Sequence, residues 1–151
     1  MMQYPWGKGT PKWTRDAAAN DSDKSFTVPT GKIWDLKTIV VNITATATVG
    51  NRLLVVGVTD GTNVVYVSPK SGNITASQTA SALFTIDLAQ SGTTANNVPL
   101  LSYANPNTSI YFPLPKMVLP AGYIVRVYDY AAIDAAADDM IVVLHYVEYD
   151  A

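Results

Sequence analysis

The fold is decided by Met140-Ile-Val-Val-Leu-His-Tyr-Val-Glu-Tyr149, the closing stretch of the chain. β-Branched and aromatic residues are typical of a strand, in which successive side chains point to opposite faces of a sheet. The alternation gives two apolar faces: Met140, Val142, Leu144 and Tyr146 on one, and Ile141, Val143 and Val147 on the other. Antiparallel strands usually have one polar face, so the second apolar face needs a cover, either another subunit or loops of the same chain. We expect a subunit interface at the following residues: Ile141, Val143, Val147 and Tyr149.

Similar strand patterns fill the chain from residue 24 onward. They cover eight segments: 24–28, 33–46, 53–59, 64–68, 80–89, 110–119, 123–130 and 140–149. The second segment changes its apolar face near Lys37, which predicts a bulge or bend, and Asp60-Gly-Thr-Asn63 predicts a hairpin turn. Because no helix is indicated, these strands and turns predict an all-β domain over residues 24–151, an eight-stranded jelly-roll β-sandwich.

Residues 1–23 have a different texture. Prolines and glycines interrupt any periodicity here, and proline lacks the backbone donor that a packed element uses. We expect an extended N-terminal arm over residues 1–23, with a floppy terminus as the alternative. Disordered segments are usually poor in aromatic residues, which favours an arm that docks onto other protein. Its candidate docking residues are aromatic or cationic: Tyr4, Trp6, Lys8, Lys12, Trp13 and Arg15.

The composition fits one domain and excludes several functions. A chain of 151 residues can bury a core of its own, and the absence of cysteine excludes disulfides and thiolate sites. The net charge is −2 with only ten Lys and Arg, so no cationic groove for nucleic acid is expected. We find no signal peptide and no membrane-spanning run, and expect assembly inside the cell. A charged fraction of 15% indicates either surface that other protein covers or a neutral β-protein surface.

No constellation of reactive side chains stands out. The chain has one histidine, His145, and it has neither a Gly-x-Ser-x-Gly turn nor a phosphate-binding glycine loop. Asp134, Asp138 and Asp139 share a loop, but their spacing does not match a calcium loop. We therefore expect no enzyme activity, no cofactor and no metal. Exposed tyrosines could stack on sugar rings, although tyrosine is also a common strand former. These candidates are Tyr103, Tyr111, Tyr128, Tyr130, Tyr146 and Tyr149.

Several short motifs, taken in order, resemble those of small jelly-roll capsid decoration proteins of tailed bacteriophages, also called cement or auxiliary head proteins. The motifs are Val28-Pro-Thr-Gly-Lys-Ile-Trp34, Thr48-Val-Gly-Asn-Arg52, Thr59-Asp-Gly-Thr-Asn63, Leu119-Pro-Ala-Gly-Tyr123 and Asp138-Asp-Met-Ile-Val-Val-Leu144. Their order and spacing carry the resemblance, which extends over residues 28–147 and leaves out the expected arm.

The resemblance implies a structural virion protein that binds the major capsid lattice and stabilises the head. It implies a homotrimer on the outer surface of the capsid, assembled in the host cytoplasm, with the major capsid protein and other copies of itself as partners. Neither nucleic acid nor membrane is an expected partner, and the family supplies no catalytic residue. The alternative is a head-fibre or receptor-binding module that binds glycans. A secreted carbohydrate-binding module and a hydrolase are weaker rivals.

Overall fold

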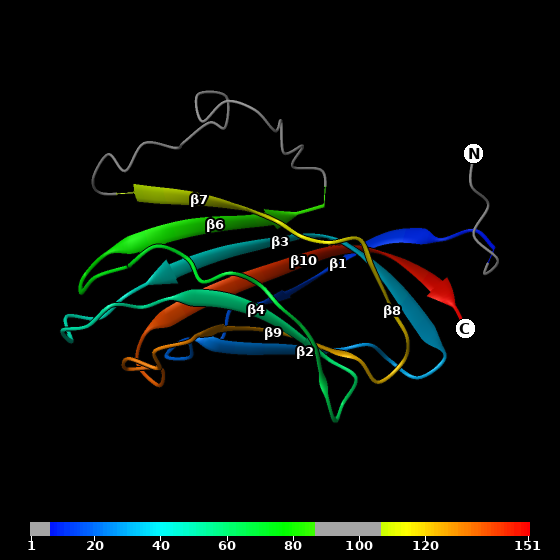
Figure 1. Cartoon of the computed structure of the whole chain (residues 1–151), viewed down its shortest axis with the longest axis horizontal. Coiled ribbons are helices and arrows are strands. Elements are labelled where there is room, and N and C mark those ends of the chain that lie inside the picture. Colours follow the sequence, from blue (N-terminus) through cyan, green and yellow to red (C-terminus); the bar gives the residue numbers. More distant parts are fainter. Residues whose placement is uncertain (1–6, 87–106) are drawn as a thin grey trace.

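Two β-sheets pack face to face as a sandwich (Figure 1). The structure is a computed structural model, and it describes residues 7–86 and 107–151, without the side chains of residues 107–111. One sheet has six strands in the order β1-β10-β3-β6-β7, with β8 also paired to β3. The other sheet has four strands in the order β2-β9-β4-β5. The all-β sandwich predicted from the sequence is confirmed.

The strands of the six-stranded sheet are β1 (Thr10–Asp16), β3 (Lys32–Thr44), β6 (Thr79–Thr85), β7 (Asn107–Pro113), β8 (Met117–Leu119) and β10 (Asp139–Asp150). Those of the four-stranded sheet are β2 (Asp23–Thr27), β4 (Leu54–Thr59), β5 (Val64–Val67) and β9 (Ile124–Asp129). Neighbouring strands run antiparallel except β6 and β7, which are parallel.

Strand β3 organises the six-stranded sheet. It pairs with β10 along its length, and its other edge is shared between β8, opposite Trp34, and β6, opposite Val41. The β3–β10 ladder shifts because Thr38 pairs with His145 and Leu36 pairs with Tyr146, which leaves Lys37 without a partner on β10. The bulge predicted near Lys37 is therefore confirmed.

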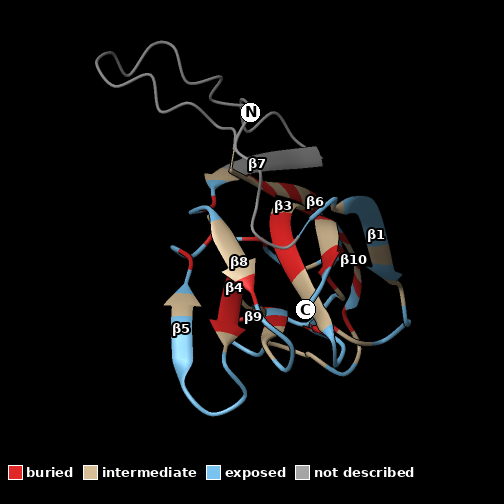
Figure 2. Cartoon of the chain, turned by 90° about the vertical axis from the view of Figure 1, so that its right-hand side faces the viewer, coloured by how far each residue is buried: buried red, intermediate tan, exposed pale blue. Residues whose placement is uncertain are grey.

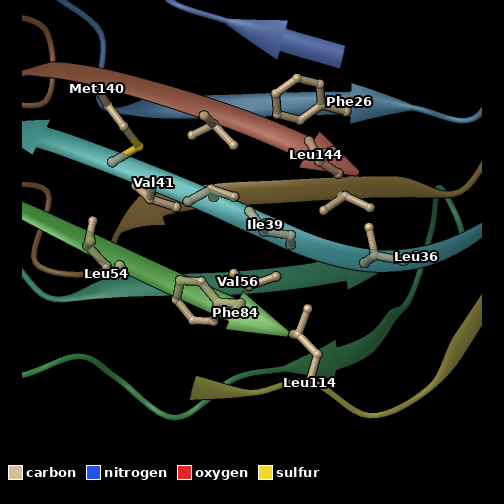
Figure 3. Packing of buried hydrophobic residues seen from close by; sticks show 14 of the residues in the cluster. Phe26, Leu36, Ile39, Val41, Leu54, Val56, Phe84, Leu114, Met140 and Leu144 are labelled. Atoms are coloured by element: carbon tan, nitrogen blue, oxygen red, sulfur yellow. The ribbon is translucent and has the colours of Figure 1, made fainter. Parts of the chain in front are cut away.

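The core lies between the two sheets and comes from the inward residues of both. Figure 3 shows side chains from β3, β6 and β10 meeting those of β2 and β4, among them Ile39, Phe84, Leu144, Phe26 and Val56. Isoleucine, leucine and phenylalanine at these positions are at most 8% exposed. Burial of such side chains contributes about 1.5–3 kcal/mol each, so alternate residues of the long strands supply most of the stabilisation.

The chain departs from the sequence-based prediction at its start. Thr10–Asp16, expected to belong to an arm, forms the edge strand β1 and pairs with β10 over its whole length. Pro11 fits there because an edge strand needs no ladder donor on its free side. Residues 1–6 lie outside the described part.

A further difference is that the strand predicted over 110–119 is two strands, β7 and β8. Between them Leu114 N donates to Thr85 O at 2.9 Å.

A buried ion pair joins two loops at one end of the sandwich. Arg52 Nε donates to Asp138 Oδ2 at 2.8 Å and Arg52 Nη2 donates to Asp138 Oδ1 at 3.1 Å, with both residues fully buried. The guanidinium also donates to the carbonyl oxygens of Thr48 and Gly50 at 2.8 and 3.0 Å. Thr46 N donates to Asp138 Oδ1 at 2.8 Å. The pair therefore fixes the loop before β4 against the loop before β10.

Asp138→Asn should lower the free energy of unfolding by about 3–5 kcal/mol, because it leaves a buried guanidinium without its counter-charge. Urea denaturation followed by circular dichroism measures the change. Asp150→Asn is the matched control. It removes a carboxylate that pairs with Lys32 Nζ at 2.5 Å on the surface, where solvent screening makes the pair weak. Equal stability of the two variants would contradict the assigned role of Arg52 and Asp138.

Candidate interaction surfaces

Strand β1 is fastened to the sandwich by ion pairs as well as by its ladder. Lys12 Nζ lies 2.6 Å from Glu148 Oε1 of β10, and the Trp34 indole donates to Glu148 Oε2 at 3.1 Å. Trp34 in turn stacks on Tyr146, with ring centroids 4.1 Å apart. The Lys12 ammonium holds the pKa of the Glu148 carboxyl below its ordinary value of 4.5, and the Trp34 N–H acts in the same direction.

A fully buried lysine, Lys24, binds the segment that follows β1. Lys24 Nζ donates to Ala18 O at 2.8 Å and to Asp21 Oδ2 at 3.1 Å, and it lies 3.3 Å from Asp16 Oδ1. A buried ammonium is costly unless it is paired and hydrogen-bonded. Residues 16–24 are therefore part of the folded domain, and the expected boundary at residue 24 does not separate two structural units here.

The candidate docking residues of the expected arm differ in their exposure and contacts. Lys12 is used in the pair with Glu148, whereas Trp13 is 65% exposed and Lys8 and Arg15 are exposed. Trp13 pairs with His145 across the ladder, so both side chains share the outer face of the six-stranded sheet. The remaining candidates, Tyr4 and Trp6, lie outside the described residues.

The outer face of the six-stranded sheet carries a short apolar row. Residues directly opposite each other in neighbouring strands share a face, and Val143, Val40 and Leu83 are opposite one another on β10, β3 and β6. All three are half-buried, as is Ile141 in the next row, where its partner is Asn42. Of the expected interface residues, Ile141 and Val143 therefore lie on this outer face.

Of the other two expected interface residues, Tyr149 is buried by the chain itself and Val147 is half-buried. A Cβ placed on Gly9 would lie 2.3 Å from Val147 Cγ1 and 2.5 Å from Tyr149 Cε1. The backbone just before β1 thus passes over both side chains, and Tyr149 is only 6% exposed. The local pattern of the closing strand cannot predict this contact, because it depends on Gly9, which is far away in the sequence.

Strands β5 and β8 lie near each other, far from β1 (Figure 2). Residues of both strands line a groove. Its volume is about 380 Å³, and its lining is mainly apolar: Val58, Val65, Tyr66, Pro115, Lys116, Met117, Val118, Leu119 and Tyr123. Strand β5 forms one rim, and its valines Val64, Val65 and Val67 are 66%, 56% and 49% exposed. Sequence reasoning recognised the strand but missed this surface. The available signal was a Val-Val-Tyr-Val run without proline or charge.

The tyrosines proposed for sugar stacking are dispersed. Tyr146 and Tyr149 are buried, Tyr128 is half-buried beneath the Arg126 guanidinium at 4.3 Å, and Tyr130 is 54% exposed beneath Lys70 Nζ at 3.4 Å. Tyr103 and the side chain of Tyr111 lie outside the described part. Among the tyrosines whose side chains are described, Tyr130 is the most accessible candidate for a sugar ring.

The acids of the predicted loop serve the fold. Asp138 pairs with Arg52, and Asp134 accepts from the hydroxyls of Thr46 and Thr48 at 2.6 and 2.7 Å, which lowers the pKa of its carboxyl. Across residues 7–86 and 107–151, no group of three or more Asp, Glu or His side chains is arranged to hold a metal ion. In the same ranges no helix has the length and hydropathy needed to cross a membrane.

Comparison with known proteins adds no assignment to this geometry. No protein-family model matches the chain. No curated protein matches it at a significant level.

Acid should lower the free energy of unfolding by protonating Glu148, which pairs with Lys12 of β1. Because its folded pKa is depressed, its contribution to stability is complete above the ordinary value of 4.5 and is lost as the pH falls below it. We expect Glu148→Gln to flatten the fall in unfolding free energy between pH 6 and pH 3.5, measured by urea denaturation. Asp150→Asn is the comparison: Lys32 also lowers the pKa of that carboxyl, but the pair is exposed and screened by solvent, so its effect on the pH slope should be smaller. An unchanged pH slope for Glu148→Gln would contradict the assignment.

Proposed function

We propose that this chain is a structural virion protein, a capsid decoration protein that binds the major capsid lattice of a tailed bacteriophage and stabilises the head. The motif resemblance over residues 28–147 supports the family, and a rigid sandwich suits a protein that must bear load between capsid subunits. In this proposal the strand path is of jelly-roll type, the chain acts as a homotrimer on the outer capsid surface, and it has no enzymatic role.

The observation that carries the proposal is the exposed indole of Trp13. Trp13 is 65% exposed and therefore presents a large apolar surface to solvent. Its backbone is held by the β1–β10 ladder, and the neighbouring Lys12 is tied to Glu148. Buried aromatic anchors dominate the binding energy of protein interfaces, and a preorganised anchor loses little entropy on binding. Burial of the Trp13 indole in a pocket of a partner protein is therefore more favourable than its exposure to solvent.

Charge around Trp13 favours a protein partner with acidic groups at the rim of its pocket. Lys8 and Arg15 are exposed near the indole in sequence, and Arg15 lies opposite Val143 on the same outer face. The apolar row of Val143, Val40 and Leu83 continues inward from this edge. We assign the row, together with Ile141, to contact between copies in the proposed trimer. Trp13 lies on β1, at the edge of this same face, and we assign that edge to the capsid contact.

The test is sedimentation of the purified protein with capsids built from the major capsid protein of the same phage. Trp13→Ala should weaken binding about thirtyfold, since loss of an interface anchor costs about 2 kcal/mol. Tyr130→Ala is the matched control, because Tyr130 is also an exposed aromatic residue, at 54%, but lies away from β1. Deleting residues 1–6 tests Tyr4 and Trp6 separately and keeps β1 and the partners of Lys24.

Full binding by Trp13→Ala would remove Trp13 as the anchor. If the wild-type chain ignores capsids and binds glycans on an array, the head-fibre or receptor-binding alternative replaces the proposal. In that case Tyr130→Ala should abolish glycan binding, because Tyr130 is the most accessible tyrosine among those whose side chains are described.

A further inference from the structure

Strand β1 is held in place with little help from the core. None of its seven residues is buried, whereas β6, which is equally long, buries three. Among the described strands β1 pairs with β10 alone. Segments with few buried apolar contacts open at a lower free energy than the core strands of the same protein. The attachment of β1 therefore depends on its ladder with β10 and on the ion pairs of its side chains.

Each ion pair that fastens β1 to the sandwich uses a carboxylate. Near the start of the strand, Lys12 Nζ lies 2.6 Å from Glu148 Oε1. Lys32 of β3 also faces Glu148, with its Nζ 4.0 Å from Oε1. At the end of the strand, Asp16 Oδ1 lies 3.3 Å from Lys24 Nζ. The two lysines differ in exposure, because the Lys12 side chain is 48% exposed and the Lys24 side chain has no exposed surface.

The segment between β1 and β2 supplies the other partners of Lys24. Lys24 Nζ donates to Ala18 O at 2.8 Å and to Asp21 Oδ2 at 3.1 Å. The same segment is tied to the start of β10, because Asn20 N donates to Asp139 Oδ1 at 2.6 Å. The acids near this segment therefore come from β1, from the segment itself and from β10.

Both fastenings weaken in acid. The Ala18 N–H and, to a lesser degree, Lys24 hold the pKa of the Asp16 carboxyl below its ordinary value of 3.8. Lys12 holds the pKa of the Glu148 carboxyl below 4.5. A carboxyl whose folded pKa is depressed contributes its full stabilisation above the ordinary value and loses it as the pH falls further. The hold on β1 is therefore complete at neutral pH and is lost below about pH 4.5.

The loss is most severe at the buried lysine. The side chains of Asp16 and Asp21 are 35% and 41% exposed, so they can be protonated without opening the core. The Arg52–Asp138 pair, in contrast, has no exposed side-chain surface. Once both exposed acids are neutral, Lys24 is a buried ammonium without a counter-charge, which strongly destabilises a fold. Opening of the segment around it brings water to the ammonium and relieves this cost.

We propose that residues 10–22 form an acid-released strap, which leaves β10 when Asp16, Asp21 and Glu148 are protonated, while the rest of the sandwich stays folded. Release frees the edge of β10 and the backbone at Trp13, both of which the β1–β10 ladder holds at neutral pH. The strap does not depend on the proposed capsid function, because it follows from contacts within one chain.

Amide hydrogen exchange of the wild-type chain tests the strap directly. Protection factors at pH 7 and pH 3.5 are compared after correction for the effect of pH on free peptides. At pH 3.5 the amides of β1 should exchange within about tenfold of the free-peptide rate, while those of β9, an inner strand of the other sheet, stay protected about a thousandfold or more. Protection of β1 that persists at pH 3.5 would overturn the proposal, and so would loss of protection in both strands.

A double variant tests the assigned groups. Lys24→Met with Glu148→Gln removes the buried ammonium and the acid partner of Lys12, so β1 should be protected about tenfold or more above the wild-type chain at pH 3.5. Lys70→Met with Asp60→Asn is the matched control, because it removes one lysine and one carboxylate that do not contact the strap. The control should lose β1 protection as the wild-type chain does. Wild-type behaviour of the Lys24→Met/Glu148→Gln chain, once exchange at pH 7 verifies that it folds, would overturn the proposal.

Discussion

The ladder between β3 and β10 is the constraint on which the other features depend. It sends alternate residues of the closing strand to the core and to the outer face, so Val142 is buried while Val143 is left at the surface. It also places β10 where it can pair with β1, which has no other strand partner among the described residues, and this pairing fixes the backbone at Trp13. The register shift at Lys37 keeps Tyr146 on the inner side, where it stacks on Trp34. Core, outer face and edge therefore follow from one pairing.

Much of the fold could be predicted from the sequence because its signals are local. Alternation of apolar residues identified the strands, Asp60-Gly-Thr-Asn63 identified the β4–β5 turn, and the change of face near Lys37 identified the bulge. The prediction was wrong for Thr10–Asp16, because Pro11 and the glycines before it argue against a strand in isolation. At a sheet edge that objection disappears, and β10 supplies the partner that no local pattern could reveal.

The candidate surfaces were harder to predict, since they depend on which residues the folded chain covers. Ile141 and Val143 reach the outer face as expected from alternation, but Tyr149 is buried because Gly9 passes over it. Arg52 and Asp138 are separated by 86 residues, and their pairing follows only from closure of the sandwich. The valines of β5 were visible as an uncharged run, but the groove that Val65 lines with residues of β8 depends on how the two sheets pack.

The position of β10 inside its sheet has a consequence for biosynthesis. It is the last strand along the chain, but it lies between β1 and β3 rather than at an edge. Until β10 has been translated, β1 lacks the strand with which it pairs, and the edge of β3 that pairs with β10 is unpaired. The larger sheet is therefore completed only after translation has passed Asp150, and contacts of such long sequence separation form slowly. Until then the unpaired edges of β1 and β3 expose the nascent polypeptide to aggregation.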